Sequence, residues 1–153
     1  MKDLIFLLAL TFIVGCNKND DEFIPLTISP TLIGHGNLYG NGQEKITKQN
    51  LIITSNKAWT ELMTKINSAN SETDSFIETE IDFSNFILLA VFDEIKMNGV
   101  YTIDITGVVE NKNDLTVTIQ HLSPNGGVYT VITQPFHIVK IPITKKKIFF
   151  NEM

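Results

Sequence analysis

The chain has 153 residues, of which 43% are hydrophobic and 19% are charged, and its formal net charge is −5. This length accommodates one domain with a substantial hydrophobic core plus a short extension. The acidic balance argues against a nucleic-acid-binding protein, which needs a clustered basic face, and no arginine is present to clamp phosphate. The single cysteine excludes an internal disulfide, a thiolate zinc cage and a C-x-x-C redox pair. We therefore expect no nucleic-acid partner and no cofactor.

The first element is an apolar run, "LIFLLALTFIVG" (4–15), in which Thr11 is the only polar residue. A helix that crosses a bilayer needs about 20 residues, so this run is too short to span and instead matches the apolar part of a secretory signal. The run ends in "IVGC" (13–16), which resembles a bacterial lipobox. That resemblance implies cleavage after Gly15 and acylation of Cys16, which would anchor the chain stably through two or three acyl chains. The alternatives are an uncleaved anchor helix and an ordinary signal cut elsewhere.

A polar, acidic stretch, "NKNDDE" (17–22), follows the cysteine. Such a composition cannot bury apolar surface and is typical of a tether. It also resembles the export signal of surface lipoproteins in some Gram-negative bacteria, here carried by Lys18, Asp20, Asp21 and Glu22. We therefore expect a signal peptide (1–15), a lipidated cysteine with its polar tether (16–30), and a single β-rich domain (31–153). The expected location is the outer membrane, with surface display favoured over a tether that faces the periplasm.

The segments before the helix alternate between weak strand patterns and turn chemistry. "FIPLTISP" (23–30) is interrupted by prolines, which predicts an edge strand or a lead-in. "LIGHGNLYGNGQ" (32–43) holds four glycines and two asparagines, which predicts a loop. "KQNLIITS" (48–55) predicts a strand.

Residues 56–67 form the segment with a clear helical period. Its apolar residues recur at i, i+3, i+4 and i+7, at Trp59, Leu62, Met63 and Ile66. Ser55 or Asn56 can cap this helix by accepting a hydrogen bond from a free backbone N–H group. The following segment, 68–82, is acidic and polar and predicts an exposed connection. Its carboxylates lack the loop spacing and the central glycine of an EF-hand, so we expect no metal site there.

The remainder of the chain is strand in pattern. "FILLAVFD" (86–93) is apolar at nearly every position and predicts a central strand buried on both faces. Alternating segments at 99–110 and 114–122 predict an antiparallel hairpin, 128–143 predicts two short strands or one strand bent at Pro135, and 147–150 can close the sheet. The expected fold is mainly β, in the α+β class, with antiparallel sheets forming a sandwich or open barrel and one packed helix.

The order of these segments resembles the PrcB C-terminal domain-like family. The resemblance is carried by the helix with Trp59, then "IDFSNFILLAVF" (81–92), "NGVYTIDITGVV" (98–109) and "TQPFHIVKIP" (133–142). It spans roughly residues 45–143, although Val100 separates a glycine from a tyrosine where the family tends to have paired glycines before the tyrosine. The family is named for a subunit of a bacterial surface protease complex, where it accompanies the protease without being the catalytic chain. The resemblance therefore implies a β-rich fold and a protein partner.

Candidate site residues are few. The three histidines show no metal-ligand spacing and no H-E-x-x-H motif, and no G-x-S-x-G elbow is present, so we expect neither catalysis nor a metal site. The glycine-rich segment 34–42 lacks the βαβ context of a dinucleotide fingerprint. As a contact loop it would offer His35 and Tyr39, and the turn before the hairpin would offer Gly99 and Tyr101.

These features predict a lipid-anchored envelope protein that acts as a non-catalytic protein-binding or assembly module, associated with an envelope protease. A lipoprotein of the surface that binds a small ligand or a glycan is the alternative. A hydrolase with unrecognised geometry is a third hypothesis, and the least favoured.

The lipid anchor gives the first testable prediction. We expect the Cys16→Ser variant to move from the membrane to the soluble fraction, or to stall before cleavage, because the acylated sulfur is lost. Membrane fractionation with mass analysis of the mature chain measures both outcomes. Unchanged membrane retention of a variant that is still cleaved would contradict the prediction.

Overall fold

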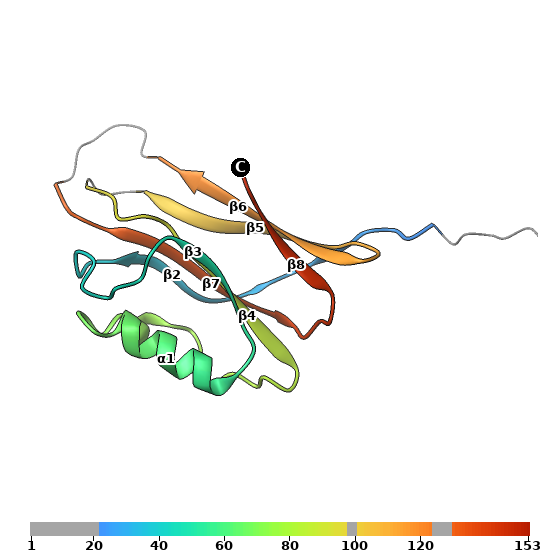
Figure 1. Cartoon of the computed structure of the whole chain (residues 1–153), viewed down its shortest axis with the longest axis horizontal. Helices are drawn as coiled ribbons and strands as arrows, with labels where there is room; N and C mark the ends of the chain where they lie inside the picture. Colours follow the sequence, from blue (N-terminus) through green and yellow to red (C-terminus); the bar gives the residue numbers. More distant parts are fainter. Residues whose placement is uncertain (1–21, 98–100, 124–129) are drawn as a thin grey trace, which may run out of the picture.

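The computed structural model describes residues 22–97, 101–123 and 130–153, and these fold as two stacked four-stranded sheets (Figure 1). One sheet has the strand order β2-β7-β4-β3 and the other β1-β5-β6-β8. The sheets do not close into a barrel. The prediction of a mainly β fold with antiparallel sheets is thereby confirmed, and of the two expected architectures the sandwich is the one observed.

The first sheet contains β2 (Thr31–Leu38), β7 (Gln134–Pro142), β4 (Phe86–Phe92) and β3 (Gln49–Ile53), all paired antiparallel. As predicted, β4 is central and buried on both faces. Its alternate side chains enter two separate cores, because successive strand residues point to opposite faces. Leu88, Ala90 and Phe92 pack toward the helix side, and Ile87, Leu89 and Val91 pack toward the second sheet.

The second sheet is built around the predicted hairpin of β5 (Thr102–Glu110) and β6 (Asp114–Leu122). Strand β1 (Leu26–Ile28) adds antiparallel to β5 at one edge, and β8 (Lys147–Glu152) adds parallel to β6 at the other. Strand β1 confirms the edge-strand interpretation of 23–30. The folded domain therefore begins before residue 31, inside the segment assigned to the tether.

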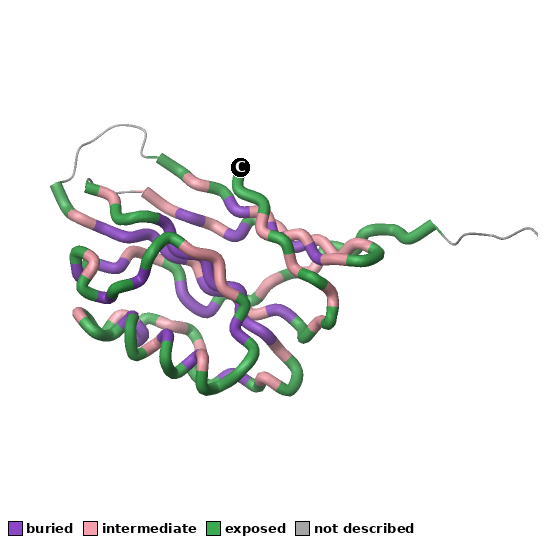
Figure 2. Tube along the Cα trace, viewed as in Figure 1, coloured by how far each residue is buried: buried purple, intermediate pink, exposed green. Residues whose placement is uncertain are grey.

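The helix α1 (Asn56–Ile66) covers the outer face of the β2-β7-β4-β3 sheet and makes a third layer (Figures 1 and 2). Trp59, Leu62 and Ile66 are buried against that sheet, as the helical period predicts. The Ser55 hydroxyl caps the helix by accepting from the Ala58 backbone N–H at 3.3 Å. Within the described ranges, no helix combines the length and apolar character that crossing a membrane requires.

The prediction of a loop at the glycine-rich segment 32–43 is wrong, because most of that segment belongs to β2. Gly34 supplies space instead of a turn: a Cβ atom there would lie 2.5 Å from the Phe76 ring. The turn is confined to the residues after β2, where Asn41 and Gly42 adopt φ angles of 51° and 80°.

The structure adds a 3₁₀ helix to one predicted connection, and at 128–143 it shows the single strand that was one of the two predicted alternatives. The predicted exposed connection 68–82 contains a 3₁₀ helix, η1 (Glu72–Ser75), followed by Phe76, whose ring packs on the helix-side core. In 128–143, the single strand β7 continues past Pro135 because its neighbours β2 and β4 pair with it on both sides. Residues 128 and 129 lie outside the described residues.

We expect Gly34→Ala to lower the free energy of unfolding by about 1–3 kcal/mol, because the new methyl group overpacks against Phe76. That ring is held between Trp59 and Phe136, with centroid distances of 6.0 and 5.9 Å. Gly107→Ala is the matched control, since a Cβ atom there meets nothing closer than 3.7 Å. Urea denaturation measures both variants, and equal losses would contradict the packing argument.

Candidate functional site

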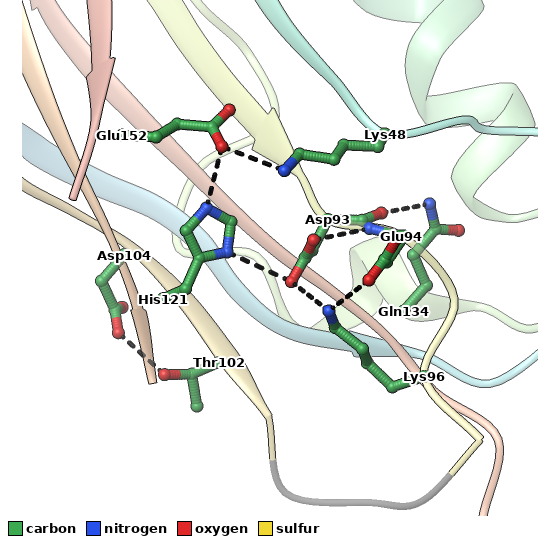
Figure 3. Close-up of polar contacts among 9 residues, drawn as sticks. All are labelled: Lys48, Asp93, Glu94, Lys96, Thr102, Asp104, His121, Gln134 and Glu152. Atoms are coloured by element: carbon green, nitrogen blue, oxygen red, sulfur yellow. Dashed lines mark hydrogen bonds and ion pairs between the residues drawn. The ribbon is translucent and has the colours of Figure 1, made fainter. Parts of the chain in front are cut away.

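A cleft of about 360 Å³ opens at the end of the sandwich where β4 and β6 finish (Figure 3). Its charged side chains come from distant parts of the chain: Lys48 precedes β3, Asp93 follows β4, His121 lies near the end of β6, and Glu152 ends β8. Each of these residues terminates or flanks a strand. The cleft is therefore assembled by the stacking of the two sheets, because the strand ends of both sheets meet there.

Asp93 is the centre of the cleft's polar network, with its side chain only 3% exposed. Its carboxylate accepts hydrogen bonds from the Glu94 backbone N–H at 2.7 Å and from His121 Nδ1 at 3.2 Å, and it pairs with Lys96 Nζ at 3.1 Å. Burial alone would raise the pKa of Asp93, but the hydrogen bonds from Glu94, Lys96 and His121 outweigh it and lower the pKa. The buried group is thus held as a carboxylate.

His121 joins the buried carboxylate to the outer rim of the cleft. Its Nδ1 lies 3.2 Å from Asp93 Oδ2, and its Nε2 lies 3.3 Å from Glu152 Oε2. Glu152 also accepts from Lys48 Nζ at 2.9 Å, and this bond is the main cause of the lowered pKa of Glu152. Because both ring nitrogens face carboxylates, His121 ties the last strand, β8, to the residue that follows β4.

His121 of the cleft is not arranged as the base of a Ser–His–Asp triad. A Ser–His–Asp arrangement needs a hydroxyl on the imidazole nitrogen opposite the carboxylate, but Glu152 occupies that position on His121. In the described ranges, no hydrogen bond joins a Ser or Thr hydroxyl to a histidine ring. The same ranges contain no group of three or more His, Cys, Asp or Glu side chains that could hold a metal ion.

A second polar cluster lies between the sheets, along the side where β2 and β5 approach each other. His35 of β2 and His137 of β7 are directly opposed in register, with ring centroids 5.1 Å apart. Asp104 of β5 lies 3.0 Å from His35 Nε2. His137 Nδ1 accepts the Ile105 backbone N–H at 2.9 Å, so its 3.4 Å approach to Asp104 is not a hydrogen bond. Two histidines that look unrelated in the sequence therefore share one site.

The predicted contact residues lie in different parts of the structure. His35 lies within β2 rather than on a loop, and Tyr39 follows that strand with its side chain exposed. Tyr101 lines the cleft, and Lys96 Nζ lies 5.2 Å from the centroid of its ring. Gly99 falls outside the described residues, and so do Gly15 and Cys16, the predicted cleavage and lipidation positions. Of the predicted contact residues that the structure describes, Tyr101 lines the cleft, whereas His35 and Tyr39 do not.

Three residues of the cleft, Lys48, Asp93 and Glu152, were not predicted as site residues. The sequence holds one signal for Asp93. It is the first charged residue after the seven consecutive apolar positions of β4, so its carboxylate lies where the buried strand ends. Lys48 and Glu152 are separated by 104 positions, and nothing local to either indicates their pairing.

The buried histidine gives a pH-dependent prediction. Burial, together with the neighbouring His35, lowers the pKa of His137 from 6.5 to about 4, although Asp104 opposes the shift. A lowered pKa means that the unfolded chain binds the proton first, so the stabilisation is complete above pH 6.5 and is lost as the pH falls toward 4. We expect up to about 2 kcal/mol of this loss between pH 7 and pH 5. Urea denaturation of His137→Gln across this range should show a shallower dependence, and curves parallel to those of the unmodified protein would contradict the assignment.

No protein-family model, no curated protein and no solved structure matches the chain. The resemblance to the PrcB C-terminal domain-like family therefore stays a prediction.

Proposed function

We propose that this chain is a lipid-anchored outer-membrane protein, displayed at the surface, whose β-sandwich is a non-catalytic protein-binding module. The observation that carries the proposal is the opposite placement of the cleft and the incoming chain. Strand β1 pairs with β5 at Ile28–Val108 and Leu26–Glu110, at the end where the chain enters (Figure 1). The cleft lies beyond the start of β5, where Tyr101 lines it. Nine strand residues separate the two ends by about 27 Å. A chain anchored at Cys16 would hold the cleft away from the membrane.

The chemistry of the cleft favours a protein partner over a small polar ligand. Both lysines of the cleft are already paired, Lys48 with Glu152 and Lys96 with Asp93 and Glu94. A small charged ligand would have to displace these pairs to reach the floor.

Two exposed apolar side chains, Leu122 and Met153, line the cleft beside these ion pairs. Apolar side chains around a charge-paired centre are what a docking protein can bury without breaking the ion pairs.

Tethering supplies the mechanism. An anchored module meets its partner at a high effective concentration, so a weak contact suffices for stable assembly in the same envelope. A protease complex of the envelope, which the family resemblance implies, is the first partner to test. Both ring nitrogens of His121 face carboxylates, which supports a non-catalytic role for the described part of the chain.

An affinity pull-down of the intact anchored protein from its own envelope, in mild detergent, tests the proposal. We expect a stoichiometric partner with the unmodified protein, and its loss when Leu122 on the cleft rim is changed to Glu. Ile77→Glu is the matched control, because Ile77 is 70% exposed but lies on the connection after η1. Recovery of no partner, or equal loss in both variants, would count against a binding module at the cleft.

A further inference from the structure

Exposed apolar side chains gather where the chain enters the sandwich, at the end opposite the cleft. Ile24 is 82% exposed, Ile143 54%, Phe149 45% and Phe23 39%. They come from the segment before β1, from the connection between β7 and β8, and from β8 itself. Exposed apolar side chains that lie together are uncommon unless they contact something.

Lys146 joins these segments into one surface. Its Nζ lies 4.8 Å from the Phe23 ring centroid, donates to the Asn111 carbonyl at 2.5 Å, and pairs with Glu110 at 2.9 Å. The incoming chain, the β5–β6 turn and the β7–β8 connection therefore meet at this end. We call this the entry-end surface; it comprises Phe23, Ile24, Lys112, Ile143, Lys145, Lys146, Lys147 and Phe149.

The entry-end surface carries lysines that are not paired with carboxylates of the protein. No ion pair among the described residues includes Lys112, Lys145 or Lys147, and none includes Glu22, the residue before Phe23. Three ammonium groups and one carboxylate are therefore unpaired at this end, which leaves a positive balance. The carboxylates of the adjoining hairpin are engaged within the protein, because Glu110 pairs with Lys146 and Asp114 accepts from Asn111. Lys147 Nζ also lies 4.7 Å from the Phe149 ring centroid, which combines a cation with an aromatic face.

The length of the chain before this surface limits what can cover it. Cys16 and Phe23 are seven residues apart, and a fully extended chain of that length spans at most about 25 Å. Acyl chains on Cys16 would therefore keep this end of the domain within reach of the lipid headgroups. Exposed aromatic and aliphatic side chains with lysines among them are the combination that binds the boundary between headgroups and acyl chains.

We propose that the entry-end surface rests on the membrane, with its apolar side chains at the boundary of the acyl chains and its free lysines on anionic headgroups. The inference rests on the lipid anchor of the proposed function and adds an orientation to it. The anchor and the surface act as two membrane signals at the same end of the domain, so β5 stands away from the bilayer and presents the cleft outward.

The test uses the mature, lipidated protein in vesicles of phosphatidylcholine alone or with an equal part of phosphatidylglycerol. With the Cys16 sulfur acylated, an introduced cysteine is the sole thiol and can carry an environment-sensitive fluorophore. Ile143→Cys reports on the entry-end surface, and Met97→Cys, at the exposed cleft end, is the matched control. We expect bromine-labelled lipid to quench the probe at position 143 but not the probe at position 97, more strongly in the anionic vesicles.

A charge variant tests the role of the lysines. Changing Lys112, Lys145 and Lys147 together to Gln should abolish the extra quenching in anionic vesicles, whereas changing Lys57 and Lys65 of α1 to Gln should not. If the unmodified protein does not float with vesicles, the anchor itself is wrong, and the orientation with it. If the protein floats but the two probes are quenched equally, the anchor stands and the orientation is overturned. Unchanged quenching in the triple variant would refute the lysine contacts.

Discussion

Strand β4 is buried on both faces, and this burial requires a layer on each side of its sheet. Its seven residues are apolar, so neither face can be left to water, and a layer must cover each side. The helix α1 and the segment with Phe76 cover one face, and the β1-β5-β6-β8 sheet covers the other. The three-layer arrangement follows from this strand, because alternate side chains of a single element belong to two cores.

The two sheets are also joined by polar contacts at their margins, where the apolar cores end. On one side, the His137 ring accepts the Ile105 backbone N–H across the gap between the sheets. At the cleft end, His121 of β6 meets Asp93, which follows β4. Buried polar groups are costly unless they are bonded, so these contacts fix how one sheet sits on the other. The two ends of the sandwich differ chemically. One end holds the ion-paired cleft, and the end where the chain enters holds unpaired lysines among apolar side chains.

The fold was largely readable from local patterns because those patterns reflect burial. Period-two alternation located the β5–β6 hairpin, helical spacing located α1, and Ser55 capped the helix as its type and position indicated. The loop prediction for the glycine-rich segment was wrong because a glycine indicates either a turn or a position where another group packs close to the backbone. At Gly34 the second meaning applies, since the Phe76 ring occupies the space of the missing side chain. That ring is 42 positions away, so no local pattern distinguishes the two.

Residues close together in the chain were enough to predict the β-rich class, the central strand and the helix, and they also predict a lipid anchor at Cys16. The cleft and the pairing of His35 with His137 could be seen only in the folded structure. Both bring together side chains from strands that are neighbours only after the sheets form, as Lys48 and Glu152 illustrate across 104 positions. Which charges meet is set by strand order and register, and these follow from how the two cores pack around β4.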